Sequence, residues 1–128
     1  MIGIWKNSQL IADQFAANGY YTLLIDEFDG DALTLNRPHG FDFQAWRGKH
    51  TTDKIDPIVE AAVKYLREEK GIKKIGAVGY CFGAKYVVRF LNGRGVDAGY
   101  CAHPVSQTAF LTYNSPIGLH MTSLVIRH

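Results

Sequence analysis

The 128-residue sequence is poor in cysteine, lacks any long apolar run, and has no acidic residue after Asp97. Its two cysteines, Cys81 and Cys101, are too far apart for a CxxC motif and too few for a disulfide scaffold. This usage favours a reducing, cytoplasmic location. No segment reaches the roughly 20 apolar residues of a membrane span, and the first residues lack the basic and apolar regions of a signal peptide. A membrane protein and a secreted disulfide-rich domain are therefore not expected.

Charges of both signs are interspersed along the chain, and the formal net charge is only +2. Because there is no basic stripe with interleaved aromatic residues, nucleic acid is not an expected partner. Gly76, Gly79 and Gly83 do not form the GxGxxG pattern of a nucleotide-binding loop, and no GK[ST] follows them. An acidic cluster at residues 26–31 suits turn and capping roles, with an acidic rim or cation site as the alternative. We expect no cofactor and no metal.

The hydrophobic fraction of 47% suffices for the core of one domain. Apolar periodicity predicts strands that alternate with amphipathic helices, an order typical of an α/β domain with a mostly parallel sheet flanked by helices. The expected elements are a helix capped by Asn7 or Ser8, a strand at 20–26, a long loop at 27–50 with a short helix at 43–47, a helix from Asp56 and Pro57 to Gly71, a strand at 73–79, a helix at 84–91 and a strand at 96–102. Residues 105–128 do not continue this pattern and can hold one short strand.

The sequence Gly79-Tyr80-Cys81-Phe82-Gly83 lies between a predicted strand and a predicted helix. This is the spacing of a nucleophile elbow, in which glycines let the strand and helix approach each other and a sharp turn presents the central side chain. The helix N-terminus is expected to favour the Cys81 thiolate, and the Phe82 amide to face a developing oxyanion. A buried structural cysteine is the alternative.

The segment KKIGAVGYCFGAKYVVRFL, Lys73 to Leu91, closely resembles the cysteine elbow of the dienelactone hydrolase family, especially its fungal members. Similarity extends through GIWKNSQLIADQFAANGYYTLLIDEFDGDALTLNRP and VDAGYCAHP. The resemblance implies a partial α/β-hydrolase fold that cleaves a lactone or ester with a Cys-Asp-His triad. It implies that Cys81 is the nucleophile, and that Phe82 and the loop around Ile2 supply oxyanion donors. Residues 1–104 are expected to form the family-like core and 105–128 an unrelated tail, so that the chain is truncated at both ends.

The expected triad acid and base have no clear counterpart. Asp97 is the only acid after the elbow, and it begins a strand at the opposite edge of the sheet. His103, which ends that strand, is a candidate replacement base or a structural His-Pro turn. His39 and His50 are expected to be solvated. In the long loop, Arg37, Trp46 and Arg47 are candidates for binding a carboxylate-bearing substrate.

Three hypotheses follow from these residues. The leading one is a cysteine hydrolase of the dienelactone hydrolase type, whose partner is a small lactone or ester. The second is a catalytically impaired fragment or isoform that binds ligand or a full-length relative without turnover. The third is a redox-responsive thiol module. Uncovered sheet edges also predict self-association.

Overall fold

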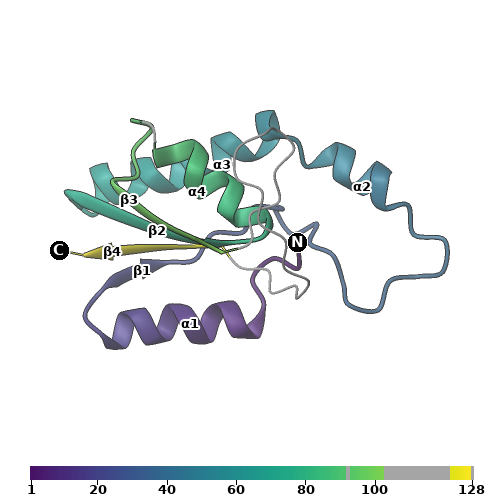
Figure 1. Cartoon of the computed structure of the whole chain (residues 1–128), viewed down its shortest axis with the longest axis horizontal. Helices are drawn as coiled ribbons and strands as arrows, with labels where there is room; N and C mark the ends of the chain where they lie inside the picture. Colours follow the sequence, from purple (N-terminus) through teal and green to yellow (C-terminus); the bar gives the residue numbers. More distant parts are fainter. Residues whose placement is uncertain (92, 103–121, 128) are drawn as a thin grey trace.

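A four-stranded sheet, ordered β1-β4-β2-β3, forms the middle layer of the chain (Figure 1). The computed structural model describes residues 1–91, 93–102 and 122–127, the last of these only as backbone. The strands are β1 (Tyr21–Leu23), β2 (Lys74–Tyr80), β3 (Ala98–Ala102) and β4 (Thr122–Arg127). The predicted α/β class is confirmed, since helices lie on both faces of this sheet.

The sheet combines three mutually parallel strands with one antiparallel strand. β2 pairs in parallel with β3, whereas β4 runs antiparallel to both of its neighbours, β1 and β2. The parallel set agrees with the strands predicted from the alternation of helix and strand. The sequence allowed one short strand after residue 104, but it gave no indication that this strand would lie between β1 and β2.

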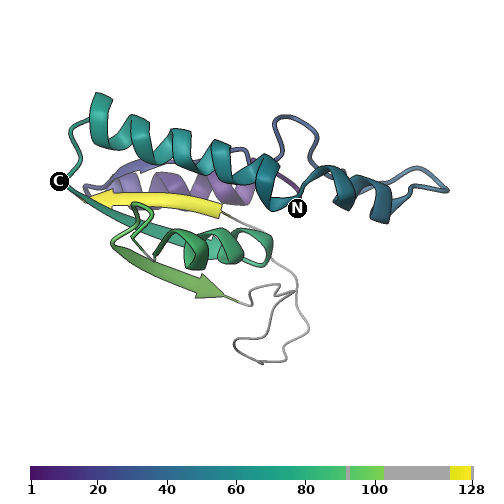
Figure 2. The same ribbon diagram turned by 90° about the horizontal axis from the view of Figure 1, so that it is seen from above.

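Two layers of helices enclose the sheet (Figures 1 and 2). On one face lie α3 (Thr52–Lys64), its π-helical continuation η1 (Tyr65–Glu69) and α4 (Phe82–Leu91), and on the other lies α1 (Lys6–Ala17). The short helix α2 (Phe43–Lys49) lies beyond the end of the sheet, near the N-terminus of the chain. No helix within the described ranges is long and apolar enough to cross a bilayer.

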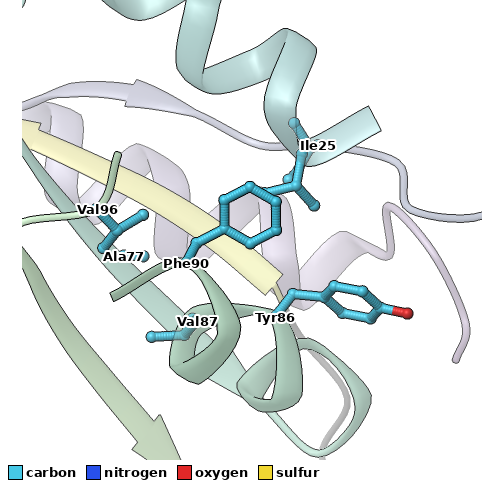
Figure 3. A pocket seen from close by; sticks show the side chains of 7 residues that line it. Ile25, Ala77, Tyr86, Val87, Phe90 and Val96 are labelled. Carbon is cyan, nitrogen blue, oxygen red and sulfur yellow. The ribbon is translucent and has the colours of Figure 1, made fainter. Parts of the chain in front are cut away.

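The main core lies between the sheet and the pair α3 and α4. Ile75 and Ala77 of β2 are buried against apolar side chains of both helices, including Val59, Leu66 and Phe90. A small apolar pocket remains there, lined by Ile25, Val59, Ala77, Tyr86, Val87, Phe90 and Val96 (Figure 3). The Tyr86 hydroxyl points away from the other labelled side chains in this view. The pocket is therefore a packing gap lined by apolar groups.

Two predicted helix starts were wrong. α1 begins at Lys6 with Trp5 as its N-cap, so that Ser8 lies inside the helix and is buried. α3 begins at Thr52 with Thr51 as its N-cap, and Pro57 lies within it. Asp56, the expected cap, instead accepts charge-assisted hydrogen bonds from Arg89 near the end of α4 and from Arg94 just after it.

Candidate active site

A sharp turn joins β2 to α4, and Cys81 lies at its apex. Cys81 has a φ of 52°, one of two non-glycine residues in the described chain with a left-handed backbone. Such a conformation is costly for a residue with a Cβ and persists only where the surrounding structure enforces it. The Cys81 amide donates to the carbonyl of Ala102, 3.0 Å away, which anchors the turn to the carboxyl end of β3. These features are those of a nucleophile elbow.

Gly79 is required by the close approach of strand and helix at this turn. A Cβ at Gly79 would lie 2.7 Å from the backbone nitrogen of Ala84 and from the carbonyl carbon and oxygen of Gly83. These are backbone atoms of α4, so they cannot move aside without displacing the helix. The glycine predicted to permit this approach does so by its lack of a side chain.

Burial changes the acid–base chemistry of the thiol. Cys81 is 7% exposed, and desolvation raises the pKa of its thiol above the ordinary value. The positive charge of the Met1 amino group and a hydrogen bond from the Phe82 backbone oppose this increase without overcoming it. The first amide of α4 favours the thiolate, but the loss of hydration outweighs it, so the pKa of the thiol is raised overall.

An aromatic cluster of Phe28, Trp46, His50 and Phe82 adjoins the elbow. The ring centroids of Phe28 and Phe82 are 5.1 Å apart, and those of Trp46 and His50 are 4.3 Å apart. Trp46 is buried, and its Nε1 donates to the backbone oxygen of Asp31 at 2.8 Å. The predicted site residues Ile2, Trp46 and Phe82 thus meet around one cluster, next to Cys81.

His50 was expected to be solvated because it lies in the long loop, but the structure buries it. Its side chain is only 8% exposed, its Nδ1 lies 2.8 Å from the carbonyl oxygen of Trp46, and its Nε2 lies 3.6 Å from a carboxylate oxygen of Asp31. His39 is exposed. Loop composition indicated exposure for both, but the spacing from Trp46 to His50 is that of neighbours on a helix, a signal that could have been used.

The two candidate substrate arginines lie in different surroundings. Arg47, on α2, is half-buried. The pKa of Lys85 on α4 is lowered, chiefly by burial and then by Arg89, and the charge of Arg47 adds to this decrease. Arg37 is exposed in the loop before α2. The structure therefore brings Arg47 towards the helix that carries the elbow, and leaves Arg37 at the surface.

Glu27 is a candidate that the sequence analysis did not single out from its acidic cluster. Asp26 has the expected turn role, since it accepts from the amides of Phe28 and Gly30. Glu27 is only 4% exposed, and its charge acts on both the Met1 amino group and Tyr86. A buried carboxylate this close to the elbow is a candidate for proton transfer. From the sequence, its acidic cluster suggested turn and capping roles, with an acidic rim or cation site as the alternative.

Asp97, the candidate triad acid, does not lie near the thiol. Asp97 precedes β3 at the amino end of the strands, where it is bound by Arg67, Lys74 and the Ile75 amide. His103 lies outside the described residues. No three metal-binding side chains cluster in the part of the chain that the structure describes.

Comparison with known proteins agrees with this geometry. The sequence model of the dienelactone hydrolase family matches residues 1–123. The chain is 51% identical over 108 residues to Hydrolase tropI of Talaromyces stipitatus, covering 78% of this chain and 42% of that protein. It is 46% identical to Hydrolase pyvD of Aspergillus violaceofuscus, covering 77% and 40%. It is 35% identical to the human carboxymethylenebutenolidase homolog, covering 63% and 33%. No solved structure matches the chain significantly.

These relatives are longer proteins, and the chain spans about two-fifths of the length of the two fungal hydrolases. The match nevertheless includes the elbow, the parallel strands β1 to β3 and the helices that flank them. The chain belongs to the dienelactone hydrolase family and has the α/β-hydrolase fold of that family in partial form.

Proposed function

We propose that this chain is a hydrolase that cleaves a lactone or ester with Cys81 as its nucleophile. The observation that carries the proposal is the left-handed backbone of Cys81 at the turn between β2 and α4. This turn puts the sulfur beside the first amides of α4, where the Phe82 N–H can stabilise an oxyanion. The loop at Ile2, which packs on the same aromatic cluster, is the proposed source of a second donor.

In the proposed reaction, the Cys81 thiol loses its proton and the thiolate attacks the carbonyl carbon. The tetrahedral intermediate collapses as the carbon–oxygen bond breaks, and the leaving alcohol takes up a proton. Water then hydrolyses the thioester, which returns the thiol and releases the acid. Because burial keeps the thiol protonated at neutral pH, the first step needs a base. His103 remains a proposed base.

The proposed substrate carries a carboxylate next to the lactone or ester. Arg47 supports this, because it is half-buried on α2 near the α4 helix, and Arg37 is a second candidate from the same segment. Trp46 is the proposed apolar wall. Free thiols at Cys81 and Cys101 support a cytoplasmic location, since a nucleophilic sulfur must stay reduced.

A second candidate function is ligand binding without turnover. It is favoured by the position of Asp97, the only acid after the elbow, whose carboxylate is held by Arg67 and Lys74 at the far end of the sheet. A full-length relative is the alternative partner. The two candidates differ in whether the thioester is hydrolysed, which can be measured directly.

The test is p-nitrophenyl acetate cleavage by the intact chain, Cys81→Ala, Cys101→Ala and His103→Ala. We expect one burst of nitrophenol per chain followed by very slow turnover, because loss of triad members costs on the order of 10⁴-fold in rate. The burst should vanish in Cys81→Ala and persist in Cys101→Ala, the matched thiol control. Loss of turnover in His103→Ala would identify the base.

A burst that persists in Cys81→Ala would exclude the proposed nucleophile. Sustained turnover at an ordinary esterase rate would instead show that a complete proton-transfer machinery is present. A burst without turnover would favour the second candidate, a chain that can be acylated but does not complete the cycle.

A further inference from the structure

Among the described strands, β3 forms one border of the sheet (Figure 2). Its first three residues are exposed, and the strand Ala98–Ala102 contains neither a charged residue nor a proline. Proteins usually protect an edge strand with such residues, because unpaired backbone groups at an edge bind other strands. The opposite border differs, since β1 has only three residues and Lys70 lies over the ring of its Tyr21. The β3 edge is therefore the one suited to pairing.

The backbone groups of β3 alternate in direction. The Ala102 carbonyl accepts from the Cys81 amide at the end of β2, so the backbone groups of Ala102 and of Tyr100, two residues earlier, face β2. The N–H and C=O groups of Gly99 and Cys101 then face outward, and they are the donors and acceptors that a further strand would use. The bond from Cys81 also joins this edge strand to the elbow.

An exposed aromatic side chain flanks the edge on the α1 face of the sheet. Tyr100 is 59% exposed, and its ring centroid lies 6.1 Å from that of Tyr80 on β2. An open groove of about 500 Å³ separates it from α1, with Phe15 and Val78 among the lining residues. Because α1 packs against β1 and β4, it leaves this side of β3 uncovered.

An exposed apolar side chain also flanks the edge on the opposite face. Val87 of α4 faces β3, since a Cβ at Gly99 would lie 2.5 Å from its Cγ1. Successive residues of a helix are about 100° apart, so Tyr86 and Val88 lie on the two sides of Val87. Tyr86 is buried in the core shared with α3, whereas Val88 is 49% exposed on the side away from α3.

We propose that two copies of the chain pair through β3 in an antiparallel, two-fold symmetric dimer centred on Tyr100. The outward groups are symmetric about this residue, so Gly99 of each copy meets Cys101 of the other. The two Tyr100 side chains then form a pair without mutual backbone hydrogen bonds, the type in which cross-strand side chains are closest. The same axis brings the two Val88 side chains together on the α4 face.

A second copy fits this edge because it carries the same uncharged strand with the same spacing of outward groups. A contact of one surface with itself closes at two copies, which distinguishes it from the open-ended association that uncovered edges allow in general. The dimer does not depend on the proposed hydrolase activity, and its tests do not use that activity.

The first test is the mass of the intact chain. Light scattering during chromatography should give twice the 14.3 kDa of one chain, and the single-chain mass on dilution. Tyr100→Lys should raise the dissociation constant by at least about ten-fold, because two like charges then face each other across the axis. Leu10→Lys is the matched control, since it puts the same charge at a 53% exposed leucine of α1 and should leave the dimer unchanged.

The second test determines which residues face each other. In a Cys81→Ala, Cys101→Ala background, which has no other cysteine, Tyr100→Cys should form a disulfide between two chains under mild oxidation. Ala98→Cys should not, because position 98 lies opposite Ala102 of the second copy and far from its own counterpart. Equal cross-linking of the two variants would contradict the proposed register.

Hydrogen exchange in the wild-type chain decides the matter without any substitution. The outward amides of Gly99 and Cys101 should exchange slowly at high protein concentration and faster on dilution. Rapid exchange of both amides at every concentration would overturn the proposal. A single-chain mass throughout, or association that Tyr100→Lys leaves as strong as in wild type, would also overturn it.

Discussion

At the scale of single residues, the burial of Cys81 determines how its reactivity depends on pH. The pKa of the thiol is raised, chiefly by desolvation, so the thiolate becomes abundant only above the ordinary range of a cysteine. We expect iodoacetamide to modify Cys81 more slowly at pH 7 than a free thiol, with a rate that keeps rising through pH 9. Peptide mapping across this pH range measures the rate at each cysteine.

Cys101 is the internal control for this labelling. Its pKa is also raised by burial, and its Sγ donates to the Ala84 carbonyl at 3.6 Å, under α4. Cys81 has the Met1 amino charge and the helix end to favour its thiolate, and Cys101 has neither. Labelling of Cys81 should therefore exceed that of Cys101 at each pH, and preferential labelling of Cys101 would contradict the assignment of the nucleophile.

A site residue could be predicted from the sequence when its role depends on neighbours in the chain, and could not when it depends on distant segments. The roles of Gly79 and Cys81 depend on a turn of five residues, and they could be inferred from local spacing alone. The burial of Glu27 and His50 depends on how residues 27–50 fold onto the elbow, which no local period specifies. The net pKa of the thiol also depends on burial, so the turn could be predicted from local spacing whereas the balance between desolvation and the helix end could not.

At the scale of secondary structure elements, Asp97 links η1, β2 and β3. Its carboxylate accepts from Arg67 of η1 at 2.7 Å, from Lys74 at 3.3 Å and from the Ile75 amide at 2.8 Å. The Ile75 amide, followed by the side chains of Arg67 and Lys74, lowers the pKa of Asp97 to about 2. The contribution to stability is complete above the unfolded-state value of about 4 and is lost as the pH falls towards 2.

We therefore expect Asp97→Asn to destabilise the chain at pH 7 and to reduce the further loss of stability between pH 4 and pH 2. Urea unfolding at these three pH values measures both effects. Asp13→Asn, an exposed carboxylate of α1, is the matched control and should change neither. An equal loss of stability on acidification in wild type and Asp97→Asn would show that other carboxylates cause the acid sensitivity.

The helix boundaries show why elements were predicted better than their ends. Apolar periodicity located α3 and α4 because their buried faces repeat every three to four residues. Asp56 satisfied the local rules for an N-cap, yet its partners Arg89 and Arg94 are more than thirty residues away. Only the packed fold brings such groups together, and the stronger charged pair then decides where the side chain points.

At the scale of the whole molecule, β4 holds the two halves of the sheet together. Among the described strands, β1 hydrogen-bonds to β4 alone, and β2 carries β4 on one side and β3 on the other. Val125 pairs with Thr22 on one side and Gly76 on the other. Disruption of β4 would therefore leave β1 without a strand partner and open a new edge on β2.

Val125→Pro should separate these halves, because proline cannot donate to a ladder within a sheet. We expect a broader melt and a larger mass by light scattering than in wild type, through pairing of the exposed edges. Val125→Thr, which keeps the amide and the β-branched side chain, should behave as wild type does. A Val125→Pro chain that melts as sharply as wild type would show that β4 does not join the two halves.

The self-association expected of the wild-type chain remains a prediction, with the β3 edge as its proposed surface.

The position of β4 also bears on the order in which the chain folds. β2 and β3 are joined by a single helix, so Gly76 and Ala98 can meet after closure of a short loop. Tyr21 pairs with Ile126, so this contact must close a loop that includes nearly all of the chain. Since the entropy of loop closure is lost before such a contact forms, the ladder between β1 and β4 should be the slowest to assemble. The β2-α4-β3 unit, which carries the elbow, would then be ordered before the segment that supplies the aromatic cluster is anchored.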